Sequence, residues 1–288
     1  MSKSLTGDIQ RHPSFPSKIL GNQRDILVYL PEGYRRFRLR RYPVLYLHDG
    51  QNVFDAATSY AGVEWGADET SHRLTAAKLM EPIIIVAVAN TGEDRIHEYT
   101  PTVAPIDEAK KKRSKGSLRS YGRFLIEELK PFIDRKYRTK RDAEFTGLGG
   151  SSLGGLATLV LGLWFPNYFT RLAVMSPSVW WDNCALLGIV DAVNSKKRPE
   201  LKIWLDTGTG EPGWERARQL RDHLLAKGWR LNVDLHYMEA PGSDHSERAW
   251  AERTDPMLQF LFPPPPPDQT KSRRIAAARD TLRSILRM

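Results

Sequence analysis

Short runs of apolar, β-branched and aromatic residues recur along the chain, and longer stretches with helical spacing lie between most of them. The runs predict eight strands, over residues 15–20, 25–30, 44–48, 83–89, 144–148, 172–176, 201–206 and 232–238. The stretches predict helices over residues 68–80, 118–137, 153–164, 214–227 and 247–260. Strands that alternate with helices indicate a mostly parallel sheet with helices on both faces.

The connections between the expected strands refine this α/β fold class. Residues 21–24 alone join the first two strands, which is too short for a helical crossover, so we expect an antiparallel N-terminal hairpin at one edge. Residues 177–200 separate the sixth and seventh strands, which leaves no room for a large cap domain. We expect four segments, namely a polar leader (1–14), a catalytic domain (15–262), a polyproline spacer (263–267) and a basic amphipathic tail (268–288).

The tail carries apolar residues at spacings of three and four on a background of arginines, which is typical of an amphipathic helix. Such a helix either docks on its own domain or frays in solvent, forms a homodimer contact, or anchors the protein on an acidic surface. The sequence leaves these alternatives open.

Composition narrows the class of protein. The chain has 288 residues, 41% of them hydrophobic, which fits one large domain. The net charge is +9, but residues 107–119 and 268–288 each hold six basic against two acidic side chains and leave only +1 elsewhere, so we expect no nucleic-acid-binding core. One cysteine excludes an intramolecular disulfide and a multi-cysteine metal site. No apolar run could span a bilayer and no signal peptide is apparent, so we expect a cytoplasmic protein.

A glycine-rich turn between the fifth strand and the next helix holds the candidate nucleophile. Gly150-x-Ser152-x-Gly154 is the nucleophile-elbow pattern, in which a serine sits on a sharp strand-to-helix turn. A serine needs a base, and among the seven histidines only His245 follows the serine and lies on a loop directly after a strand. The acid should lie between them, where Asp206 and Glu211 are both available, and we prefer Glu211 because it lies past the turn.

Acyl transfer also requires donors for an oxyanion. The backbone N–H groups of Leu153, after the nucleophile, and of Gln51, after the third strand, are the candidates, and Gly50 is expected to supply flexibility there. Trp180 and Trp181 follow the sixth strand at the same edge, where they are candidates for stacking on a substrate ring.

Several further motifs resemble the esterase D and enterochelin-esterase family of α/β-hydrolases, which includes feruloyl and acetyl-xylan esterases. The resemblance runs over residues 15–262 and rests on motifs beyond the elbow. These are VYLPxGY at 28–34, YPVLYLHDGQN at 42–52, RxxEYTP at 95–101, ELKPFID at 128–134 and SPSxWW at 176–181. In this family the triad acid lies in a Gly-Thr-x-Asp/Glu turn, which residues 208–211 match, so the resemblance favours Glu211.

The resemblance implies a two-step hydrolysis of a small-molecule carboxylic ester that needs no metal and no organic cofactor. Two alternatives stay open: acyl transfer to a sugar or lipid hydroxyl by the same triad, and a catalytically silent binding protein that uses its basic tail. The basic residues from Lys110 to Lys115 are expected to be a solvated surface or to favour anionic esters.

Overall fold

A computed structural model describes residues 5–107 and 109–265, so the expected tail and the last two residues of the expected spacer lie outside the described residues. The strands are β1 (Asp8–Ser17), β2 (Asn22–Leu30), β3 (Val44–His48), β4 (Ile84–Val88), β5 (Pro105–Asp107), β6 (Lys112–Arg113), β7 (Thr146–Ser151), β8 (Arg171–Met175), β9 (Lys202–Gly208) and β10 (Leu235–Ala240). The α-helices are α1 (Ala67–Ala76), α2 (Arg95–Glu98), α3 (Leu118–Arg123), α4 (Lys130–Lys136), α5 (Leu153–Trp164), α6 (Trp181–Asp191), α7 (Glu215–Ala226) and α8 (Glu247–Leu261). Short 3-10 turns cover Gly50–Asn52, Gly92–Asp94, Ala143–Phe145 and Ser195–Lys197, and a π-helix covers Phe124–Leu129.

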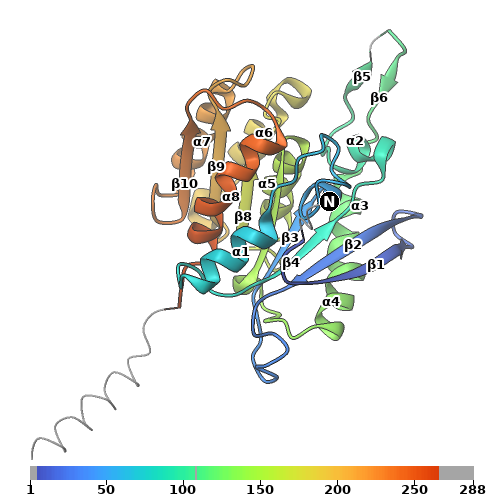
Figure 1. Ribbon diagram of the computed structural model, residues 1–288. Coiled ribbons are helices and arrows are strands. Elements are labelled where there is room, and N and C mark those ends of the chain that lie inside the picture. The colour runs from blue at the N-terminus through green and yellow to red at the C-terminus, as the bar shows by residue number, and fades with distance from the viewer. Residues whose placement is uncertain (1–4, 108, 266–288) are drawn as a thin grey trace, which may run out of the picture.

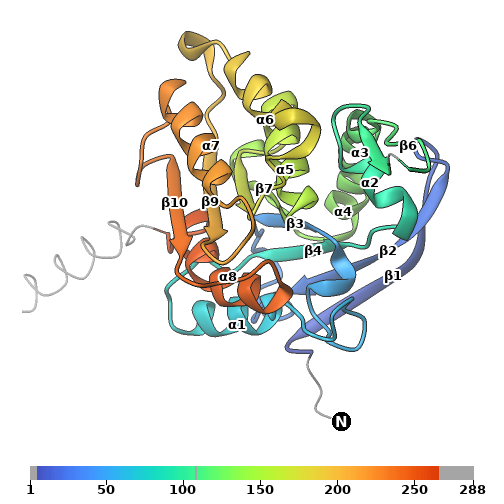
Figure 2. The same cartoon turned by 90° about the horizontal axis from the view of Figure 1, so that it is seen from above.

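Eight strands form one twisted sheet in the order β1-β2-β4-β3-β7-β8-β9-β10. The pairs β1–β2 and β2–β4 are antiparallel and the other pairs are parallel, which confirms the predicted mostly parallel sheet with an N-terminal hairpin at its edge. Figure 2 shows α1 and α8 on one side of the sheet, and α4, α5, α6 and α7 on the other. Between β8 and β9 the chain forms only α6 and one 3-10 turn, as expected for a fold without a large cap.

The helices bury their apolar residues on the two faces of the sheet. One cluster joins α3, the π-helix, α4, α5, α6 and α7 to the sheet, and it includes the fully buried Tyr121, Leu156 and Leu220. The other lies under α1 and α8 and includes Leu74 and Leu258. The central strands β3, β4 and β7 are buried along their whole length, because helices cover both of their faces.

Four local predictions need correction. The first strand begins at Asp8 rather than residue 15, and residues 8–12 pair with β2 instead of forming a polar leader. The helix expected over 118–137 has a π-helical segment between α3 and α4. The small β5–β6 hairpin within the basic loop was not predicted. Helix α6 was also missed; its residues 182–184 have left-handed φ values of 45° to 63°, which helical periodicity does not signal.

Candidate active site

The elbow serine lies at the carboxyl end of β7, where the chain turns into α5. Ser152 has φ 59° and ψ −122°, a strained conformation for a residue that carries a Cβ. A Cβ on Gly150 would lie 2.9 Å from the ring of His48, and one on Gly155 would lie 2.8 Å from the carbonyl oxygen of Met175. These close approaches explain the glycines around the serine, and the turn presents its side chain above the sheet.

His245 and Glu211 meet beside this serine. The Nδ1 atom of His245 lies 2.7 Å from Oε2 of Glu211, and His245 and Ser152 line the same two cavities. The Ser152 hydroxyl is paired with the Ser178 hydroxyl at 3.2 Å in this conformation. The carboxylate therefore fixes the orientation of the imidazole.

Glu211 is held by donors on every side. Its Oε1 accepts hydrogen bonds from the Ser176 hydroxyl (2.5 Å) and the Gly208 amide (2.7 Å). Burial alone would raise the pKa of Glu211, but the hydrogen bonds from His245, Ser176 and Gly208 hold this pKa below its ordinary value. The carboxylate stays ionised, as needed to stabilise a protonated imidazole.

Asp206, the other carboxylate considered, has a different role. It is fully buried at the end of β9, where it accepts hydrogen bonds from Trp204 Nε1 (2.6 Å) and the Ser176 amide (3.1 Å). Nε of Arg253 lies 3.2 Å from its Oδ1. Burial raises the pKa of Asp206 although Arg253 opposes that shift. Asp206 thus faces the buried arginine, and Glu211 faces the histidine.

Arg253 links both carboxylates from α8. It is 1% exposed, and its Nη2 donates to the Ser176 hydroxyl at 2.9 Å and lies 3.7 Å from Glu211 Oε1. Trp250, one turn earlier, donates its Nε1 proton to the same hydroxyl at 3.1 Å. Sequence reasoning missed Arg253 and Ser176, because their partners come from distant parts of the chain.

The loop after β3 places the second candidate oxyanion donor. Gln51 lines one cavity with Ser152, and no acceptor in the described part of the chain pairs with its backbone N–H or with that of Leu153. Gly50 was expected to supply flexibility, and this explanation of the glycine is wrong. A Cβ on Gly50 would lie 2.5 Å from the backbone of β4, and the left-handed residue of the loop is Asp49, with φ 54°. Gly50 is needed for close packing.

An ion pair between the buried Asp49 and the partly exposed Arg95 holds this loop in place. Arg95 contacts both carboxylate oxygens of Asp49 at 2.7 Å, and Asn90 donates to the same group at 2.7 Å. Burial would raise the pKa of Asp49, but Arg95 and Asn90 hold it below its usual value. His48, hydrogen-bonded to Tyr121 at 3.0 Å, has its pKa lowered to about 4 by burial and is neutral. His48 and Asp49 therefore act as scaffold for the loop.

Two cavities flank the serine. One, of about 390 Å³, has Trp180, Trp214 and Arg216 in its wall, and the other, of about 450 Å³, has polar walls that include Asn52 and Arg95. Trp180 is 55% exposed. Trp181 is 2% exposed, donates its Nε1 proton to Thr102 at 3.1 Å and lines neither of these two cavities, so only Trp180 of the pair lies beside the serine.

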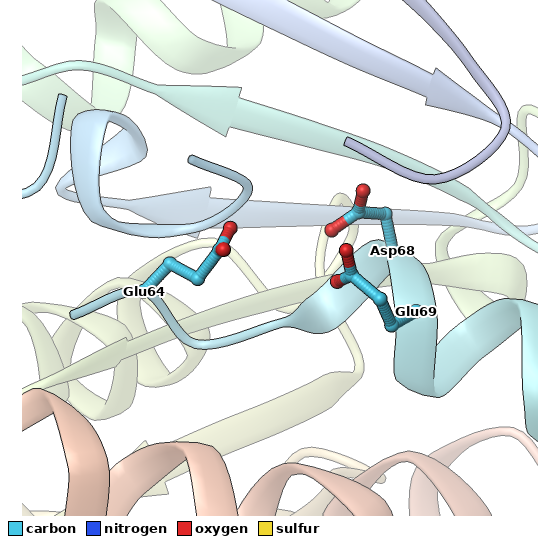
Figure 3. Close-up of side chains that lie close together, drawn as sticks. All are labelled: Glu64, Asp68 and Glu69. Atoms are coloured by element: carbon cyan, nitrogen blue, oxygen red, sulfur yellow. The ribbon is translucent and has the colours of Figure 1, made fainter. Parts of the chain in front are cut away.

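A cluster of carboxylates lies at the start of α1, where Glu64, Asp68 and Glu69 gather (Figure 3). Thr6 donates its backbone N–H to Asp68 at 2.7 Å and its hydroxyl to Glu69 at 3.3 Å. Burial raises the pKa of Asp68 to about 8, and its neighbour Glu69 adds to that shift, so the neutral acid is favoured. None of the three lines either cavity beside the serine, so we give the cluster no part in catalysis.

No helix within the described residues is long and apolar enough to cross a membrane.

Comparisons with known proteins identify the family of the chain. The family described as "Putative esterase" matches residues 17–261. The chain is 27% identical over 222 residues to "Ferri-bacillibactin esterase BesA" of Bacillus subtilis, covering 71% of this chain and 73% of that protein. It is 26% identical over 272 residues to "Endo-1,4-beta-xylanase/feruloyl esterase" of Xylanibacter ruminicola, covering 89% of this chain but 31% of that protein.

Solved structures share the fold. The BES protein of Bacillus cereus superposes with a TM-score of 0.70 at 23% identity, covering 91% of this chain and 97% of that one. This likeness, together with the observed sheet, identifies the α/β-hydrolase fold. The matched family covers most of the chain, so the chain belongs to this esterase family and is a carboxylic ester hydrolase.

Proposed function

We propose that Ser152, His245 and Glu211 form a catalytic triad that hydrolyses carboxylic esters through an acyl-enzyme. The observation that carries the proposal is the 2.7 Å contact of Glu211 with His245 beside a strained elbow serine. In the first step His245 takes the Ser152 proton, the serine oxygen attacks the ester carbon, and the imidazolium returns the proton to the leaving alcohol. Water then repeats the sequence on the acyl-enzyme and releases the acid.

The N–H groups of Gln51 and Leu153 are proposed to hold the oxyanion of each tetrahedral intermediate. Both amides lack an acceptor within the described residues, and the Asp49–Arg95 pair restrains the loop that carries Gln51. Donors fixed in advance need no reorganisation when charge develops, which is the main source of their effect on the rate.

Hydrolysis, rather than transfer to another alcohol, is favoured by access of water. The side chain of His245 is 40% exposed, and only α6 and a 3-10 turn lie between β8 and β9. A transferase must keep water from its acyl-enzyme, and an open histidine does not do so.

The substrate we propose is an ester with an aromatic acid. Trp180 and Trp214 line the cavity on one side of Ser152 and offer faces for a ring, while polar groups line the other side and suit a hydroxylated alcohol. The matched relatives named as feruloyl and ferri-bacillibactin esterases support this substrate class.

Two experiments test these proposals separately. Intact-mass analysis after treatment with phenylmethylsulfonyl fluoride should show one adduct on the wild type and on Ser151→Ala, and none on Ser152→Ala; an adduct on Ser152→Ala would refute the nucleophile. Trp180→Ala should raise KM for methyl ferulate about tenfold, with little change for p-nitrophenyl acetate. An equal change for both esters would refute the aromatic pocket and leave the triad untouched.

A further inference from the structure

The loop between β2 and β3 concentrates positive charge that the count along the sequence concealed. Five of the seven residues from 35 to 41 are arginines, and we call this segment the arginine loop. Outside residues 107–119 and 268–288 the net charge is only +1, because an excess of acidic residues elsewhere offsets the five arginines of this loop. All seven side chains are exposed.

Most of this charge is not neutralised by the protein. Arg35 pairs with Asp8 at 2.8 Å. The other four, Arg36, Arg38, Arg40 and Arg41, have no ion pair with a carboxylate in the described part of the chain. Four guanidinium groups in one short segment, without an ion-pair partner among the described residues, form a surface that favours an anionic partner.

The backbone of the loop is well anchored although its side chains are exposed. Tyr34, just before it, is buried, and the guanidinium of Arg138 lies 3.8 Å from the centre of its ring. The Arg138 side chain also donates to the carbonyl of Arg40 at 3.3 Å, and the amide of Phe37 donates to Gly33 at 2.9 Å. The arginines are thus presented by a fixed scaffold.

Apolar side chains stand among these charges. Leu39, between two arginines, is 99% exposed, and Phe37 is 49% exposed. A groove of about 800 Å³ opens beside the loop, with Phe37 and Arg36 in one wall and Lys78 and Met80 in another. An exposed leucine within a basic loop gains nothing from a nucleic acid or an acidic protein surface that is polar, whereas it gains free energy in the interface of an anionic bilayer.

The arginine loop lies away from the candidate active site, so a partner bound to the loop would leave Ser152 accessible to substrate. The arginine loop precedes the amino end of β3, whereas Ser152 follows the carboxyl end of the parallel strand β7, so the two lie at opposite ends of these neighbouring strands. Figure 1 shows this blue segment below the sheet, away from the β5–β6 hairpin. Pro264 and Pro265, at the end of the described part of the chain, line the same groove.

We propose that the arginine loop docks the protein on a membrane surface rich in anionic lipid, with Leu39 inserted among the headgroups. Each basic side chain near such a surface strengthens binding about fivefold, and a second element is generally needed for stable attachment. The six basic side chains among residues 268–288 supply further positive charge for such an attachment.

The test is sedimentation of the full chain with phosphatidylcholine vesicles that contain or lack phosphatidylserine. The wild type should bind only the anionic vesicles, and less at high salt. Arg36→Gln/Arg38→Gln should weaken binding about 25-fold. Lys110→Gln/Lys112→Gln, which removes the same charge from the β5–β6 hairpin, should change binding less than about twofold. Leu39→Ser should weaken binding several-fold without a change of charge.

Other outcomes would overturn the proposal. Equal binding by the wild type and the double arginine variant would do so, as would binding to neutral vesicles. Loss of binding in the hairpin variant alone would assign the membrane contact to the other basic segment. An unchanged affinity of Leu39→Ser, with full competition by heparin, would indicate a general polyanion site. Hydrolysis of a soluble ester should be unchanged in all variants, which shows that they are folded.

Discussion

Replacing the buried Arg253 by methionine should lower the free energy of unfolding far more than replacing an exposed arginine does. The side chain of Arg253 is 2% exposed and that of Asp206 is 0% exposed, with 3.2 Å between Nε and Oδ1. Methionine fills much of the same volume but leaves Asp206 as a buried charge without a cation. Breaking a buried pair in this way costs about 3–5 kcal/mol. In a domain of this size that corresponds to a decrease in Tm of about 6–20 °C.

Urea denaturation is the assay, with Arg218→Met as the matched control. Arg218 forms a two-contact ion pair with Glu239 at 2.8 and 2.9 Å, but its side chain is 45% exposed, so its loss should leave the denaturation midpoint nearly unchanged. The double variant Asp206→Asn/Arg253→Met removes both charges and should recover about 1–3 kcal/mol of the loss. If Arg253→Met and Arg218→Met were equally stable, the argument that a buried cation balances the carboxylates would be wrong.

Three further changes test other parts of the account. Arg95→Met frees Asp49 and loosens the oxyanion loop, so kcat should fall about 10–100-fold with partial rescue by lysine; a rise in KM alone would contradict this role. The pKa of Asp68 is raised from its ordinary value of 3.8 to about 8 in the folded protein. The contribution of the neutral acid to stability is therefore fully present below pH 3.8 and is lost as pH rises through 8. The gain in Tm from Asp68→Asn should therefore grow between pH 4 and 8, and a constant gain would oppose this assignment. Gly208→Ala should destabilise the protein, because a Cβ at this position would lie 2.2 Å from a carbonyl oxygen. Gly188→Ala in α6 has open space around its Cβ and should stabilise the protein by about 0.5–1 kcal/mol. Equal Tm values for the two variants would count against this packing argument.

The sequence predicted the sheet well, because strands buried on both faces read as continuous apolar runs. Residues 84–88 are fully buried, and their run of isoleucine and valine was unmistakable. The start of β1 was missed because its residues alternate between half-buried and exposed at a sheet edge, where polar side chains are tolerated. The break in helical geometry at residues 182–184 has no counterpart in the hydrophobic pattern.

For the site, local motifs predicted what lies within one turn of a strand end. The candidates Ser152 and His245 were predicted in this way, and the turn at residues 208–211 favoured Glu211, which the structure places 2.7 Å from the histidine. Arg253 could not be found, because its partner Asp206 lies far away in the chain and meets it only in the packed core. For the same reason the sequence did not separate the buried Trp181 from the exposed Trp180.

The most direct test of the triad is kcat/KM for p-nitrophenyl acetate with the wild type, Ser152→Ala, Glu211→Gln and Asp206→Asn. Ser152→Ala should lose activity by about 10⁴-fold or more, and Glu211→Gln by about 10²–10⁴-fold because the histidine loses its anionic partner. Asp206→Asn keeps the His245 contact and should lose less than Glu211→Gln. Wild-type activity in Ser152→Ala, or a greater loss in Asp206→Asn than in Glu211→Gln, would contradict the proposed triad.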